Sequence, residues 1–215
     1  IEPDELLGVL NKQKGKIIVT SGPTYEEIDD VKVVTNKSSG KQGRALAIEL
    51  SARGYEIIYI HSASIDHIPG LDNVSFHSSN DLKNKILENI NNTDAIFMTA
   101  AVSDFTVKKS SGKISRSNGN ITLEFIPNED IIASIKSSYP EIKCIAFSAQ
   151  VDDELNFNKI NTKKVDYLVI NNILKNNFGS DANKVSIIDH QHLIFESEEL
   201  DKNEISRDIL NALEY

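Results

Sequence analysis

The chain has 215 residues, of which 40% are hydrophobic and 26% are charged, and its formal net charge is −9. A chain of this length can bury one sizeable core, so a single folded domain is expected. The lysines and arginines are dispersed along the chain, and with the negative charge this excludes a dedicated nucleic-acid-binding protein. No apolar run approaches the ~18 residues of a membrane helix, and no secretory signal pattern is present.

The single cysteine, Cys144, lies inside the apolar run IKCIAF. It cannot form an internal disulfide, and its apolar neighbours predict a buried thiol in a reducing compartment. We therefore expect a cytoplasmic protein with no membrane partner.

Short apolar strands alternate with helical segments along most of the chain. After a short N-terminal helix in 1–13, strands are predicted at 16–20, 55–60, 74–77, 95–99, 144–147 and 167–170. Helices are predicted at 40–53, 79–91, 130–137 and 155–163, with a closing helix at 202–214. Strands 185–188 and 193–195 form a hairpin. The pattern predicts an α/β fold with a doubly wound, mostly parallel, Rossmann-like sheet, helices on both faces and a C-terminal antiparallel hairpin.

The segment 106–120, TVKKSSGKISRSNGN, is too polar to pack and is predicted to be a mobile surface loop. Its cations are Lys108, Lys109, Lys113 and Arg116. They could fold over a triphosphate, or they could be ordinary solvated surface.

The stretch TNKSSGKQG places polar groups where a helix is predicted to begin. A helix N-terminus carries unpaired N–H groups and a partial positive charge. The small residues Ser38, Ser39 and Gly40 would let phosphate oxygens approach the backbone, and Asn36 sets a carboxamide beside them. We predict an anion site here, with an ordinary capped helix as the alternative.

Polar or small residues also follow other predicted strands, at 21–24, 100–104, 128–130, 147–150 and 171–172. Open α/β sheets bind ligands at the carboxyl ends of their strands, so these positions should converge. Asp104 could accept hydrogen bonds from a sugar or help to hold Mg²⁺, or it could cap a turn. Lys159 and Lys163, four residues apart, could meet one anion from a shared helical face.

Several familiar motifs are missing. Neither a Walker A loop nor a G-x-G-x-x-G fingerprint occurs, there is no G-x-S-x-G elbow, and the scattered histidines do not make a metal site. Tyr139 and Lys143 have the Tyr-x-x-x-Lys spacing of short-chain dehydrogenases, but Pro140 and the following strand prevent the helix that would align them.

Taken together, TSGPTYEEIDDVKVVTNKSSGKQG, MTAAVSDF, GKISR, NEDIIA, AFSAQ, the spaced lysines and FGSDANK closely resemble phosphopantothenoylcysteine synthetase. The similarity covers residues 15–215 in the motif order of that family. Residues 1–14 resemble the connector of its bifunctional form, in which a flavin-dependent decarboxylase precedes the synthetase. The resemblance thus implies a synthetase domain at 15–215, with no flavin in this segment.

The resemblance implies a CTP-dependent ligase of coenzyme A biosynthesis that joins 4'-phosphopantothenate to L-cysteine. The carboxylate attacks the α-phosphate of the nucleotide to give an acyl-cytidylate and pyrophosphate, and the amine of cysteine then displaces CMP. Mg²⁺ is the expected metal, with no ligands assigned, and ATP could replace CTP. The family works as a homodimer with shared active sites.

The motif matches also imply roles for particular residues. Asn36 would bind and polarise the acyl intermediate, and Lys113 would close over the triphosphate and promote the first step. Ser38, Ser39 and Gly40 would contact phosphate. The implied nucleotide contacts are Met98, Thr99, Ala100, Asp104, Glu129, Asp130, Ile131, Ile132, Phe147, Lys159 and Lys163.

The chain departs from the family pattern at three places. Lys32 stands where an arginine is frequent, which would weaken a substrate contact to carboxylate or phosphate because lysine lacks the bidentate fork. Gln150 replaces a frequent glutamate, and Lys113-Ile114-Ser115-Arg116 replaces a lysine-rich motif. A nucleotide-binding module without ligase activity is therefore an alternative, and a nicotinamide oxidoreductase is disfavoured by the missing glycine fingerprint.

Overall fold

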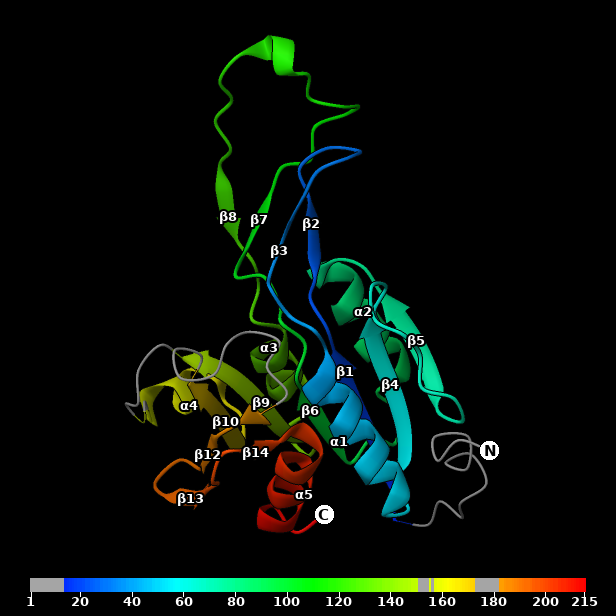
Figure 1. Cartoon of the computed structure of the whole chain (residues 1–215), viewed down its shortest axis with the longest axis vertical. Coiled ribbons are helices and arrows are strands. Elements are labelled where there is room, and N and C mark those ends of the chain that lie inside the picture. Colours follow the sequence, from blue (N-terminus) through cyan, green and yellow to red (C-terminus); the bar gives the residue numbers. More distant parts are fainter. Residues whose placement is uncertain (1–13, 151–154, 156, 173–181) are drawn as a thin grey trace.

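The computed structural model describes residues 14–150, 155, 157–172 and 182–215. The connector expected at 1–14 lies outside the described residues except for Lys14. An eight-stranded sheet forms the centre, in the order β13-β12-β10-β9-β6-β1-β4-β5 (Figure 1). Its strands are β1 (Lys16–Ser21), β4 (Glu56–Ser62), β5 (Asp72–Phe76), β6 (Ala95–Met98), β9 (Lys143–Gln150), β10 (Tyr167–Asn172), β12 (Val185–Ile188) and β13 (Leu193–Glu196).

The six strands from β5 to β10 pair in parallel, and β12 and β13 add antiparallel at one edge. This confirms the predicted mostly parallel sheet and its C-terminal hairpin. The chain builds outward from β1 in both directions, through β4 to β5 and through β6 to β9 and β10. Such a reversal of strand order leaves a crevice at the carboxyl ends of the central strands.

The helices are α1 (Lys41–Ala52), α2 (Ser79–Asn89), α3 (Ile131–Ser138), α4 (Phe157–Lys163) and α5 (Lys202–Ala212). The side chains of Ser78, Asp130 and Asp201 begin α2, α3 and α5 by accepting hydrogen bonds from backbone N–H groups of the first turn. At α5 this cap is reciprocal, because the Glu204 side chain accepts from the Asp201 N–H.

The helices divide between the two faces of the sheet. Strand β1 alternates, with Ile17 and Val19 packed in the core beneath α1 and α5, and Ile18 in the core beneath α2, α3 and α4. All three side chains have no exposed surface. Burial on both faces explains why the central strands appear in the sequence as continuous apolar runs.

Cys144 lies on β9 within the core beneath α2, α3 and α4, and none of its surface is exposed. Burial raises the pKa of its thiol to about 12. The predicted buried cysteine is therefore confirmed.

An arm projects from the sheet (Figure 1). The sequence predicted a loop at 106–120, which is one part of the arm, and did not predict its strands. The arm contains two antiparallel pairs, β2 (Tyr25–Glu27) with β3 (Val33–Thr35), and β7 (Phe105–Val107) with β8 (Phe125–Pro127). The expectation that all of 106–120 is loop was wrong, because Thr106 and Val107 belong to β7 and Val107 is buried. The partner strand β8 lies beyond the polar segment.

Two smaller elements complete the described fold. A 3-10 turn, η2 (Arg116–Asn118), lies in the part of the arm between β7 and β8. Strands β11 (Ala182–Asn183) and β14 (Leu200–Asp201) form an antiparallel pair just before α5. In the described part of the chain, no helix has the length and apolar character needed to cross a bilayer.

Candidate active site at the strand ends

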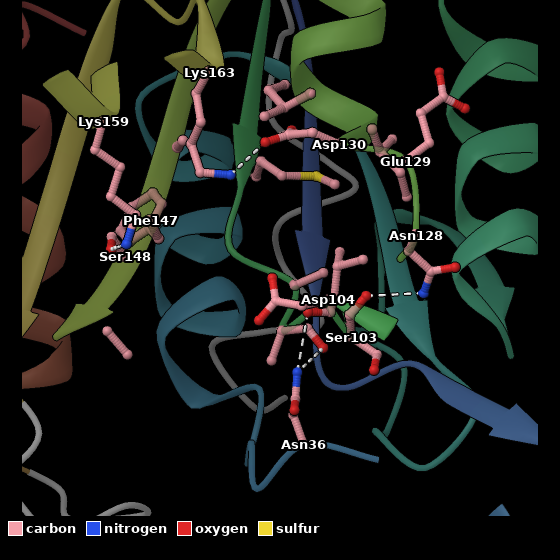
Figure 2. Close-up of a pocket in the computed structure, with 18 of the residues that line it drawn as sticks. Asn36, Ser103, Asp104, Asn128, Glu129, Asp130, Phe147, Ser148, Lys159 and Lys163 are labelled. Carbon is pink, nitrogen blue, oxygen red and sulfur yellow. Dashed lines mark hydrogen bonds and ion pairs between the residues drawn. The ribbon is translucent and has the colours of Figure 1, made fainter. Parts of the chain in front are cut away.

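A cavity of about 670 Å³ opens at the carboxyl ends of β6 and β9 (Figure 2). Its walls come from the segment after β3, the turn after β6, the start of α3, the end of β9 and one face of α4. The lining residues are Thr35, Asn36, Lys37, Met98, Ala100, Ala101, Val102, Ser103, Asp104, Asn128, Glu129, Asp130, Ile131, Ile132, Ala146, Phe147, Ser148, Ala149, Lys159 and Lys163. A mixed lining and a volume of a few hundred Å³ are typical of small-molecule sites.

The turn 101–104 is held by two asparagines, one on each side. The Asn36 Nδ2 donates to the carbonyl oxygens of Ala101 at 3.2 Å and Val102 at 3.0 Å. The Asn128 Nδ2 donates to the carbonyl of Ser103 at 2.9 Å, and its backbone N–H donates to the carbonyl of Asp104 at 2.9 Å. Four consecutive carbonyls are thereby satisfied, and the Asp104 side chain is fixed beside the cavity (Figure 2).

This geometry bears on the role predicted for Asn36. Its amide nitrogen, Nδ2, donates to two backbone carbonyls, whereas its Oδ1 has no partner among the described residues. The side chain lies at the cavity, as expected for an intermediate ligand, but its donors are already in use.

The predicted phosphate loop lies beside the cavity, where β1 ends and α1 begins. Gly40 precedes α1 with a φ of 69°, a left-handed conformation that favours glycine, and its carbonyl accepts from the Ser21 Oγ at 2.8 Å. At Gly43 an added Cβ would collide with the Thr99 hydroxyl and with Ser21. Both glycines therefore allow α1 to approach the ends of β1 and β6 closely.

Ion pairs or hydrogen bonds engage four of the six charged side chains of the cavity wall. Lys163 Nζ lies 2.7 Å from the Asp130 Oδ2, and Asp130 also caps α3. Lys159 Nζ donates to the Ser148 Oγ at 2.6 Å. The Glu129 carboxylate is turned towards α2, where Lys83 pairs with it at 2.6 Å and lowers its pKa (Figure 2).

The charged groups of the other two, Asp104 and Lys37, have neither an ion pair nor a hydrogen bond among the described residues. Counted over the whole lining, three lysines face three carboxylates, so the formal charges cancel. Within the described residues no three His, Cys, Asp or Glu side chains gather closely enough to hold a metal ion.

The structure brings most of the predicted site residues together. Those that line the cavity are Asn36, Met98, Ala100, Asp104, Glu129, Asp130, Ile131, Ile132, Phe147, Lys159 and Lys163. Those outside its lining are Lys32, Ser38, Ser39, Gly40, Thr99 and Lys113. The Thr99 hydroxyl donates to the carbonyl of Thr20, and Lys32 and Lys113 lie on the arm.

Some lining residues had been given no role from the sequence. Thr35, Lys37 and Ala146 were not singled out at all, and Ser103, Asn128 and Ser148 were covered only by stretches predicted at strand ends. For Asn128 the signal was its position directly before the acidic pair that begins a helix. Its donation to the turn after β6 could not be read from spacing, because that contact joins residues 25 positions apart.

An open, mostly parallel sheet with a polar cavity at its strand ends defines a Rossmann-like α/β domain. The chain belongs to the family described as DNA/pantothenate metabolism flavoprotein C-terminal domain, which matches residues 12–215. The family resemblance drawn from the sequence motifs is therefore confirmed.

Individual relatives are similar over most of the chain. The chain is 34% identical over 178 residues to the coenzyme A biosynthesis bifunctional protein CoaBC of Bacillus subtilis, covering 80% of this chain and 44% of that protein. It is 30% identical over 210 residues to a cysteine/cysteine sulfinic acid decarboxylase of an unknown prokaryotic organism, covering 92% of this chain and 57% of that protein. The chain thus spans about half the length of the curated relatives it matches.

Solved structures share the fold. The C-terminal domain of CoaBC superposes with a TM-score of 0.75 at 28% identity, covering 94% of this chain and 96% of that domain. A Cab2 variant in complex with phosphopantothenate-cysteine has a TM-score of 0.72 at 15% identity, with 99% and 92% covered. At that identity the second likeness shows the fold alone.

The ion pair between Lys83 and Glu129 yields a prediction on the cavity rim. Lys83→Met should move the pKa of Glu129 back up towards its ordinary value, because the nearby ammonium stabilises the charged carboxylate. The contribution of this pair to stability is present at neutral pH and is lost as the pH falls through the lowered pKa. Carboxyl-carbon NMR titration measures the shift.

Lys85→Met is the matched control, because Lys85 pairs with Glu88 on the exposed side of the same helix. It should leave the pKa of Glu129 unchanged. An unaltered titration of Glu129 in Lys83→Met would contradict the assignment.

Proposed function

We propose that this chain catalyses the ligation of 4'-phosphopantothenate with L-cysteine at the expense of a nucleoside triphosphate, with CTP as the preferred nucleotide. The observation that carries the proposal is the cavity at the strand ends, where most of the residues assigned by the family motifs meet in one lining. Family membership and the similarity to CoaBC support it.

The reaction would proceed in two displacements. A carboxylate oxygen of the acid attacks the α-phosphorus of CTP, the bond to the β-phosphate breaks, and pyrophosphate leaves. The amine of cysteine then attacks the acyl carbon, the bond to the cytidylate oxygen breaks, and CMP leaves as the amine loses a proton. Neither step needs a covalent nucleophile from the protein, so alignment and charge neutralisation would supply the catalysis.

The cavity lining suits the nucleotide end of this reaction. Met98, Ile131, Ile132 and Phe147 offer apolar surface for a ring, and Lys159 and Lys163 reach the same space from α4. Asn36 would contact the acyl intermediate, through its Oδ1 while its two donors hold the turn 101–104. The glycine-lined start of α1 would meet phosphate oxygens.

Magnesium would enter with the nucleotide. Protein sites for Mg²⁺ commonly supply one or two carboxylates and leave the other positions to phosphates and water. Asp104 fits this requirement, because it lines the cavity and no cation is paired with it in the described part of the chain. The ion would neutralise phosphate charge during the first displacement.

Additional positive charge must come from outside the cavity. The formal charges of the lining cancel, whereas a nucleoside triphosphate and a phosphorylated carboxylate bring several negative charges. Lys32 and Lys113, both assigned to substrate by the family motifs, lie on the arm rather than in the lining of their own cavity. We therefore propose a homodimer in which the arm of one copy supplies these cations to the other.

The arm has the apolar surface that such a contact needs. Val31, Val33, Phe105, Phe125 and Ile126 are between 39% and 65% exposed, and all five lie on the two hairpins. Clustered exposed apolar side chains of this kind mark interaction surfaces.

The alternative of a nucleotide-binding module without chemistry has one observation in its favour. The amide hydrogens of Asn36 and the ammonium of Lys32 are already engaged within the chain. Substrate turnover would require these groups either to be released or to act through their remaining atoms.

One assay separates the ligase from the binding module. Pyrophosphate release from CTP should require phosphopantothenate, and CMP formation should require cysteine as well. Replacing CTP by ATP or UTP should lower the rate, which measures base preference directly. Saturable CTP binding with no pyrophosphate released under any condition would support the module.

Asn36→Asp tests the role of the carboxamide. The substitution keeps an oxygen at the cavity but removes the amide that holds the turn 101–104 and places a negative charge beside the acyl-cytidylate. Because like charges brought together in a site cost several kcal/mol, cysteine-dependent CMP formation should fall by about a hundredfold. Pyrophosphate release should fall less, and acyl-cytidylate should accumulate in rapid-quench samples.

Asn128→Asp is the control, because it disturbs the same turn without a predicted substrate contact. Equal losses in both steps for the two variants would show that only the turn matters. Normal turnover by Asn36→Asp would remove Asn36 from the mechanism.

Complementation tests the shared site. Asn36→Asp and Lys113→Met should each be weakly active alone, whereas a mixture that exchanges subunits should recover about a quarter of wild-type activity, since half of the dimers would contain one site with both residues intact. Recovery should follow the appearance of dimers in sedimentation. No recovery in exchanged dimers would mean that Lys113 acts within its own subunit.

A further inference from the structure

Asp29, in the turn between β2 and β3, is a buried carboxylate on the arm. Its side chain has no exposed surface, although it carries a charge. One oxygen, Oδ1, accepts from the backbone N–H groups of Val31 at 2.8 Å and Lys32 at 2.7 Å. These bonds shape the local turn, as aspartate frequently does.

The other oxygen reaches a distant part of the chain. The Oδ2 of Asp29 accepts from the backbone N–H of Ile114 at 2.9 Å and also pairs with the Lys32 ammonium. That ammonium also lies 3.4 Å from the carbonyl oxygen of Ile114. Asp29 and Lys32 therefore contact each other, and each also contacts the backbone of Ile114. The lysine, aided by the N–H donors, holds the pKa of Asp29 well below its usual range.

Neighbouring contacts join the same two segments. The Gly112 N–H donates to the Asp30 Oδ2 at 3.0 Å, and the Gly112 carbonyl accepts from the Asp30 N–H at 3.3 Å. The Ser110 N–H donates to the carbonyl of Ile28 at 2.9 Å. Lys109 pairs with Glu27 and Asp30 at 2.8 and 3.1 Å.

Lys113 lies between the two tethered peptides. The N–H groups of its neighbours, Gly112 and Ile114, donate to Asp30 and Asp29, whereas the Lys113 side chain is exposed and has no partner among the described residues. The backbone of this lysine is therefore fixed on both sides while its ammonium remains available, unlike that of Lys109.

We propose that Asp29 is a positioning residue for the ligation: by joining the turn that carries Lys32 to the segment that carries Lys113, it holds the exposed ammonium of Lys113 in place for the substrate. The inference rests on the proposed function for its role in turnover. On this view the segment that carries Lys113 does not close over the phosphates as a free loop. It is held in place before the substrate arrives, which lowers the cost of ordering it on binding.

Asp29→Asn is the informative variant. An asparagine oxygen can still accept from Val31 and Lys32 and keep the turn, but its NH₂ group cannot accept from Ile114 or pair with the ammonium. Asp189→Asn is the matched control, since the Asp189 Oδ1 accepts from Gln191 and His192 in the same spacing and, within the described ranges, has no long-range partner to lose.

Hydrogen exchange tests the contact between Asp29 and Ile114 without reference to activity. In Asp29→Asn the amide of Ile114 should exchange about ten- to a hundredfold faster, the range for losing a hydrogen bond to a charged group. Asp189→Asn should leave that amide unchanged, and Asp30→Ala, which removes the acceptor, should speed exchange of the Gly112 amide. Unchanged exchange at Ile114 in a folded Asp29→Asn protein would overturn the proposal.

Kinetics test the route of action. The kcat for pyrophosphate release should fall about tenfold in Asp29→Asn and stay unchanged in Asp189→Asn. If Asp29 acts through Lys113, the double variant with Lys113→Met should lose no more than Lys113→Met alone. Fully additive losses would overturn the positioning role. A wild-type protein that releases no pyrophosphate would refute the ligase, and the hydrogen-exchange result would still test whether Asp29 joins the two segments.

Discussion

The arrangement of this domain depends on how the backbone is satisfied where buried strands end. Strands β1 and β6 leave the core side by side, and each must find partners for peptide groups that no longer belong to the sheet. The hydroxyls of Thr20 and Thr24 accept hydrogen bonds across this gap: the Ala100 N–H donates to the Thr20 Oγ1 at 3.1 Å, and the Ser103 N–H donates to the Thr24 Oγ1 at 3.0 Å. Asn36 and Asn128 then complete the carbonyls of the turn.

This solution has a chemical consequence. Asn36 and Asn128, which satisfy carbonyls of the turn, also line the cavity, so this part of the site is held rigid by hydrogen bonds already made. A side chain that holds the turn has fewer donors left for a substrate. The Nδ2 of Asn36 holds the turn, for example, while its Oδ1 remains available. Charge is distributed in a similar way, with cavity lysines balanced by cavity carboxylates and further lysines placed on the arm.

The central fold could be predicted because burial leaves a strong signal in the sequence. Runs such as Lys16–Ser21 and helices such as Lys41–Ala52 lie close to their predicted bounds, since long apolar runs and periodic faces have few alternatives. The arm was missed for the opposite reason. Its strands have three residues each, and the partner of Phe105–Val107 begins 18 residues after that strand ends. Short strands with distant partners carry almost no local pattern.

The residues of the site likewise fall into those that the sequence could predict and those that it could not. Cavity residues at strand ends, such as Asp104 and Phe147, could be anticipated because parallel strands share one carboxyl edge. The link between Asp29 and Ile114 joins residues 85 positions apart and depends on the pairing of the two arm hairpins, so no spacing rule could find it. The motif match marked Lys32 and Lys113 as a pair of substrate cations but gave no indication that one carboxylate connects them.

The single cysteine of the chain, buried on β9, has a practical meaning for a protein proposed to handle a free amino thiol. With its pKa raised to about 12, Cys144 is a neutral thiol at physiological pH and is shielded from solvent. It offers no thiolate to form a mixed disulfide with the amino acid or with a thiol-bearing product. Cys144 of the folded protein should therefore not react with maleimide or disulfide reagents. In a reaction mixture, consumption of such a reagent would then measure the small-molecule thiol alone.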